Sequence, residues 1–153
     1  MMTFKKLFLF LVLTFSIGLQ AKEYKAVFDC SSGNASYLVS RMFLIERTIN
    51  MMEEDGNSVK FALTIHGKCA PLVTKNIDEV FFDDSKIALF EKAQTQLVRL
   101  IKKKNVEVTV CAMSLNANTI AKEDVLKNIK ISKNSFIDTI GYQNDGYALM
   151  TFK

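Results

Sequence analysis

The sequence of 153 residues has no tryptophan, one proline, one histidine and six glycines. None of the glycines belongs to a GxGxxG pattern or to a phosphate-binding P-loop, so the sequence gives no support to a nucleotide cofactor. Repeats and tracts of low complexity are also absent, which excludes solenoid and compositionally disordered classes. We therefore expect an ordinary globular protein without a cofactor.

The apolar residues that could form a long run are confined to the start of the chain. Residues 1–21 contain a basic pair, Lys5 and Lys6, then an apolar stretch, and end at Ala21 before the charged Lys22-Glu23. This order is typical of a secretory signal peptide, and we predict cleavage after Ala21. The apolar stretch is shorter than the ~20 residues of a membrane-spanning helix. We expect a periplasmic or secreted protein without a stable membrane anchor.

The predicted mature chain, residues 22–153, has the length of one domain. Since Lys5 and Lys6 leave with the signal peptide, the 20 Lys and Arg side chains fall to 18 against 16 Asp and Glu, a net charge of +2. The one dense basic run, Lys102–Lys104, falls at the end of a predicted helix, where cations complement the helix dipole. We therefore expect no nucleic-acid partner.

Helical and strand-like patterns alternate along the mature chain. Leu38, Met42, Ile45 and Ile49 recur at helical spacing, whereas residues 58–65 alternate large apolar residues with polar or small ones. The predicted strands are 24–29, 58–65, 106–111, 128–132 and 147–152; the predicted helices are 35–54, 70–73, 83–104, 114–120, 122–126 and 135–143. This order predicts an α/β fold with parallel strands and helices on both faces of the sheet.

The last predicted helix, residues 135–143, has three large apolar side chains. We expect Phe136, Ile137 and Ile140 to point inward. Asn134 or Ser135 is predicted to cap its amino end.

Three cysteines in an exported chain cannot all pair within the molecule. Cys30, Cys69 and Cys111 follow or end three predicted strands, and His66 follows the second. Parallel strands would bring all four to one edge of the sheet. Two arrangements stay open: a Cys30–Cys69 disulfide that leaves Cys111 free, or a soft-metal site of three cysteines and His66, for which the spacing matches no compact CxxC pattern.

Cys111 has the strongest chemical signal. It ends the valine-rich strand 106–111, and a helix predicted to begin near Ser114 would place its positive end beside the thiol. Such a position stabilises the thiolate, which can accept sulfane sulfur as a persulfide.

The chain resembles the DsrE/DsrF-like proteins, in particular their exported single-domain members. The resemblance is carried by His66-Gly67, by Val106–Leu115 (VEVTVCAMSL), by Lys122–Leu126 and by Ile140–Ala148 (IGYQNDGYA). It implies a three-layer α/β/α fold around a five-stranded parallel sheet and a trimeric or hexameric homo-oligomer. It also implies that Cys111 is the sulfur-accepting residue.

Three functional hypotheses follow. The first is a periplasmic sulfur carrier or sulfurtransferase that uses Cys111 in a neighbourhood of Cys30, Cys69, His66 and Ser114, with a protein or a small sulfur compound as donor and acceptor. The second is a soft-metal-binding module that uses Cys30, Cys69, Cys111 and His66. The third is an oligomeric protein without chemistry of its own.

Overall fold

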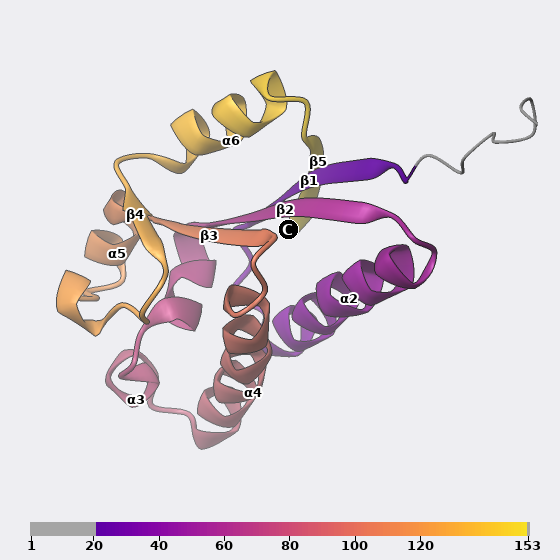
Figure 1. Cartoon of the computed structure of the whole chain (residues 1–153). Helices are drawn as coiled ribbons and strands as arrows, with labels where there is room; N and C mark the ends of the chain where they lie inside the picture. Colours follow the sequence, from indigo (N-terminus) through magenta and orange to yellow (C-terminus); the bar gives the residue numbers. More distant parts are fainter. Residues whose placement is uncertain (1–20, 153) are drawn as a thin grey trace, which may run out of the picture.

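The computed structural model describes residues 21–152, so the predicted signal peptide lies outside the described residues except for Ala21. Five parallel strands form one sheet in the order β4-β3-β2-β1-β5, with helices on both faces (Figure 1). This confirms the predicted α/β architecture. The strands are β1 (Glu23–Cys30), β2 (Ser58–Ile65), β3 (Val106–Cys111), β4 (Lys130–Ser132) and β5 (Ala148–Phe152).

Helices α2 (Ala35–Glu54) and α4 (Asp84–Ile101) cover one face of the sheet (Figure 1). Each begins at a side-chain cap, Asn34 for α2 and Asp83 for α4, as helices with exposed amide groups require. Their apolar sides pack against alternate residues of β1, β2 and β3 in a single core. The largest fully buried side chains there include Leu38, Met42, Ile49, Leu63, Phe90 and Leu97.

Helix α6 (Ser135–Asn144) lies over the opposite face (Figure 1). Because partners in a parallel ladder point the same way, the register identifies the residues of this face. One row across it is Thr151, Asp29, Thr64, Thr109 and Lys130. This row beneath α6 is polar, whereas the next row of the same face includes the buried Val27 and Ala62.

The inward orientation predicted for the apolar side of α6 is wrong. Phe136, Ile137 and Ile140 are exposed by 69%, 64% and 58%. The reason is the polar sheet face below, against which α6 turns Ser135 and Tyr142 instead. The row of Asp29, Thr64 and Thr109 on this face gives the apolar side of α6 few apolar partners.

The remaining segments deviate modestly from expectation. α5 (Ala112–Ala117) begins directly after Cys111, and the segments η1 (Gly67–Val73) and η2 (Lys122–Asp124) are 3₁₀-helical. The short α3 (Ile77–Val80) lies where the sequence indicated no element. Strand β4 is two residues shorter than predicted. It starts after Asn128, because the φ of 64° at Asn128 is incompatible with a strand. Between residues 21 and 152 no helix has the length and apolarity needed to cross a bilayer.

Candidate thiol site at the carboxyl edge of the sheet

Cys111 ends β3 and occupies the N-cap position of α5. Its side chain is only 4% exposed. Burial raises the pKa of the Cys111 thiol, but hydrogen bonds from Ser114, Ser135 and Met113 outweigh it, so the pKa lies below its ordinary value. Three of these donors are backbone N–H groups at the starts of α5 and α6, and the fourth is the Ser114 hydroxyl. Two helix amino ends therefore meet at one sulfur, which favours the thiolate.

The Ser114 hydroxyl is itself held in place. The backbone N–H of Gly67 donates to Ser114 Oγ at 2.8 Å, which leaves the hydroxyl proton free to point at Cys111. Asn118 Nδ2 donates to the carbonyls of Gly67 at 3.0 Å and Ser114 at 2.8 Å. Gly67 has a φ of 53°, a conformation that glycine adopts without strain. These contacts fix the start of η1 against α5.

His66 lies beyond the end of β2 and is hydrogen-bonded through Nε2 to Asp29 Oδ1 at 2.9 Å. Thr64 Oγ1 donates to the same carboxylate oxygen at 3.1 Å. The hydrogen bond to Asp29 raises the pKa of His66; burial opposes this, and the charges of Asp29 and Cys111 add to it. A protonated imidazole and a thiolate therefore stabilise each other at this edge.

Cys30 and Cys69 form a disulfide with Cα atoms 5.9 Å apart. Both are completely buried. The bond joins the end of β1 to η1, whose first residue, Gly67, orients Ser114. Cys111 is the free cysteine of the described chain.

The alternative of a metal site with four ligands is not supported by this arrangement. Disulfide sulfurs are not thiolates, so Cys30 and Cys69 could serve as ligands only after reduction. Among residues 21–152, no group of three or more His, Cys, Asp or Glu side chains is placed to hold a metal ion.

The structure brings together Cys111, His66 and Ser114, which the sequence had singled out, and it adds Asp29 and the backbone of Ser135. A carboxylate in the strand segment just before Cys30 was the available signal for Asp29. No sequence signal indicated the contribution of Ser135, because it depends on how α6, which is distant from Cys111 in the sequence, packs against the sheet.

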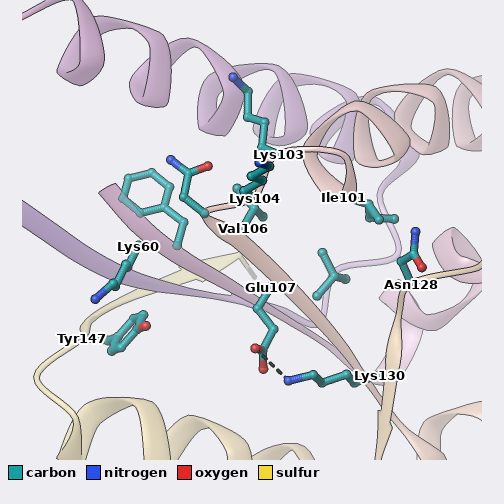
Figure 2. A pocket seen from close by; sticks show the side chains of 12 residues that line it. Lys60, Ile101, Lys103, Lys104, Val106, Glu107, Asn128, Lys130 and Tyr147 are labelled. Atoms are coloured by element: carbon teal, nitrogen blue, oxygen red, sulfur yellow. Dashed lines mark ion pairs between the residues drawn. The ribbon is translucent and has the colours of Figure 1, made fainter. Parts of the chain in front are cut away.

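Two hollows lie on the sheet face that carries α6 and at its amino-terminal edge. One, of about 400 Å³, lies between α6 and strands β3 and β4. The other, of about 480 Å³, lies at the amino-terminal end of β3, where Lys60, Lys103, Lys104 and Lys130 contribute to its lining (Figure 2). Glu107 and Lys130 line both hollows and form an ion pair of 2.8 Å. Neither cavity contains a cysteine among its lining residues.

Fold and site together define an α/β protein with one activated thiol at the carboxyl edge of a five-stranded parallel sheet. Residues 25–152 match the model of the DsrE/DsrF-like family, and the chain belongs to this family.

A protein of Aquifex aeolicus (strain VF5), described only as uncharacterized, is 36% identical over 148 residues. The match covers 97% of this chain and 64% of the relative, so the chain spans less than two thirds of that protein's length. The structure of MTH1491, a protein of unknown function from Methanobacterium thermoautotrophicum, superposes with a TM-score of 0.65 at 13% identity, covering 84% of this chain and 99% of the other. The likeness to MTH1491 concerns the fold.

Proposed function

We propose that this protein carries sulfane sulfur as a persulfide on Cys111, as a periplasmic or secreted member of a family of sulfur-relay type. The observation that carries the proposal is the place of Cys111, buried at the end of β3 and at the N-cap of α5, where hydrogen bonding from Ser114, Ser135 and Met113 holds the thiol pKa below its ordinary value. Donors of this kind stabilise negative charge on sulfur, both in the thiolate before the reaction and in the thiolate that remains after sulfur is passed on.

The loading reaction conserves electrons without an added oxidant. The Cys111 thiolate attacks the sulfane sulfur of a donor such as thiosulfate, a sulfur–sulfur bond forms to Cys111, and the bond to the leaving sulfite breaks with its electron pair. The Cys30–Cys69 disulfide keeps the other two sulfurs out of this chemistry. His66, paired with Asp29, supplies a positive charge that favours the anionic forms of Cys111.

The exposed apolar side of α6 supports the further proposal that copies of the chain associate. Phe136, Ile137 and Ile140 form this side, which a folded protein in water tends to cover.

Mass spectrometry of the intact protein after incubation with thiosulfate or polysulfide tests the proposal. We expect an added mass of about 32 Da, one sulfur atom, that is removed by dithiothreitol and absent from Cys111→Ser. The disulfide should stay intact in both proteins. An unmodified wild-type chain, or an adduct that persists in Cys111→Ser, would overturn the assignment.

A further inference from the structure

A carboxylate, an imidazole and a thiol lie on three adjacent strands near the carboxyl edge of the sheet. Asp29 belongs to β1, His66 follows β2 and Cys111 ends β3. Ile65 and Val110 are register partners, so His66 and Cys111 occupy the next position of the same parallel ladder. His66 stays extended, with a φ of −151° and a ψ of 179°, and its N–H donates to the last carbonyl of β1 at 2.9 Å. The strand geometry therefore continues through His66.

The imidazole and the thiol lie on the sheet face that α6 covers, because side chains alternate along a strand. Thr64 lies on that face two residues before His66. Its register partner Thr109 lies there two residues before Cys111. Neighbouring strands are about 4.8 Å apart, so the side chains of His66 and Cys111 are neighbours. The contribution of the Cys111 charge to the raised pKa of His66 agrees with this placement.

The hydrogen bond to Asp29 determines which nitrogen of His66 can exchange a proton. A carboxylate only accepts, so Nε2, 2.9 Å from Asp29 Oδ1, carries a proton in both charge states of the ring. Nδ1 is then the nitrogen that gains and loses the second proton. The His66 side chain is 19% exposed, against 4% for Cys111, so water reaches the pair at the imidazole. Nδ1 can therefore regain its proton from solvent after each reaction.

We propose that His66 donates its Nδ1 proton to the leaving group when Cys111 takes up sulfur, and that the sulfur donor is an organic persulfide. This inference rests on the proposed persulfide chemistry and names its donor class. The Cys111 thiolate attacks the outer sulfur of R–S–S⁻, a sulfur–sulfur bond to Cys111 forms, and the bond to the alkyl sulfur breaks with its electron pair. That alkyl sulfur takes the Nδ1 proton and leaves as R–SH, with no net oxidation.

The donor class follows from the basicity of the leaving group. An alkyl thiolate is the conjugate base of a thiol of pKa about 8.5, so it leaves much faster when an acid protonates it. Sulfite and sulfinate are weaker bases and depart without this help. A protonated imidazole beside the sulfur is therefore of use for a persulfide donor above all. Asp29 contacts the imidazole and is a positioning residue, because it holds the proton on Nε2 and leaves Nδ1 to react.

The test compares two donors that differ in the basicity of the group they release. Cysteine persulfide releases the cysteine thiolate, whereas benzenethiosulfonate releases the weakly basic benzenesulfinate. Initial rates of sulfur addition to the full chain are measured by intact-protein mass spectrometry after acid quenching. In His66→Gln the ratio of the persulfide rate to the thiosulfonate rate should fall about 100-fold. This ratio cancels the intrinsic reactivities of the donors and any loss of thiolate that slows both reactions.

Two aspartate variants complete the comparison. Asp29→Asn keeps the shape of the side chain but removes the carboxylate, and should give a smaller fall in the same ratio. Asp78→Asn, at an exposed aspartate in the first turn of α3, is the matched control and should leave the ratio unchanged.

Each outcome of this test bears on one of the two proposals. Equal losses with both donors in His66→Gln, or no loss with either, would overturn the role of His66 as an acid and the choice of a persulfide donor. If His66→Gln does not fold, as judged by its amide NMR spectrum, the ratio in Asp29→Asn decides, and an unchanged ratio there overturns the inference. Failure of wild-type Cys111 to take up sulfur from either donor would instead overturn the proposed function.

Discussion

Helices α4 and α6 cover opposite faces of the same sheet and are oriented in opposite ways. α4 buries its apolar side, with Phe90 and Leu97 fully enclosed. α6 buries one residue, Ser135, and leaves Phe136 and Ile137 exposed by 69% and 64%. The difference lies in the sheet: the face under α4 is apolar, whereas the face under α6 includes Asp29 and the threonine row.

The two faces of the sheet have different roles, one in stability and the other in the candidate site. The α2–α4 face supplies most of the burial that stabilises the fold, because apolar area removed from water contributes about 25 cal/mol per Å². The α6 face keeps polar groups near the carboxyl edge of the strands, where Cys111 and His66 lie. As a result, the apolar side of α6 points outward and is left uncovered in a single chain.

The largest expected effect is a difference in the free energy of unfolding between a substitution in α4 and the matched substitution in α6. Phe90→Ala should lower the free energy of unfolding by about 3–5 kcal/mol, because it empties a fully enclosed site in the core. Phe136→Ala, the matched change on α6, should lower it by less than about 0.5 kcal/mol at high dilution. Urea denaturation followed by circular dichroism measures both.

The dependence of these stability losses on protein concentration also distinguishes the two helices. If copies of the chain cover the outward side of α6, the loss in Phe136→Ala should grow with protein concentration, whereas that in Phe90→Ala should not. A loss in Phe136→Ala that equals the loss in Phe90→Ala at every concentration would mean that the two faces do not differ as described.

The fold could be predicted from the sequence because its signals are local. The spacing of Leu38, Met42, Ile45 and Ile49 and the alternation in residues 58–65 depend on near neighbours, and the βα order dictates parallel pairing. The orientation of α6 could not be predicted in this way. The apolar residues of α6 have a helical period, but their orientation depends on the sheet face below, which strands β1, β2 and β3 form and which is distant in sequence.

The site was predictable to the same extent. Topology placed Cys111 and His66 at one edge, and the helix after Cys111 implied donors such as Ser114. The register Asp29↔Thr64 and the approach of Ser135 to the sulfur are tertiary contacts with no sequence period. The spacings of 39 and 42 residues between cysteines match no compact CxxC metal pattern, but only the three-dimensional arrangement shows that Cys30 and Cys69 are paired.

A smaller effect concerns the thiol itself. Ser114→Ala removes the one side-chain donor to the Cys111 sulfur and should raise the thiol pKa. Ser135→Ala is the matched control, because Ser135 donates through its backbone N–H, which alanine keeps. The pH dependence of alkylation by iodoacetamide gives both values. Equal shifts in the two variants, or none in Ser114→Ala, would show that the hydroxyl does not stabilise the thiolate.

The smallest expected effect is the pH dependence contributed by His66. Because the folded pKa of His66 lies above its unfolded value of about 6.5, the stability that this pair contributes is full below that pH and is lost as pH rises through the folded pKa. Asp29→Asn should therefore lose more stability at pH 5.5 than at pH 8.5, by about 1 kcal/mol or less for a partly exposed pair. Since His66 is the only histidine, its imidazole NMR signal reports the pKa directly, and that pKa should fall in Asp29→Asn. Thr64→Val, which removes a hydrogen bond to Asp29 but no charge, should shift it less. A His66 pKa that is unchanged in Asp29→Asn would mean that the carboxylate does not support a positive charge beside Cys111.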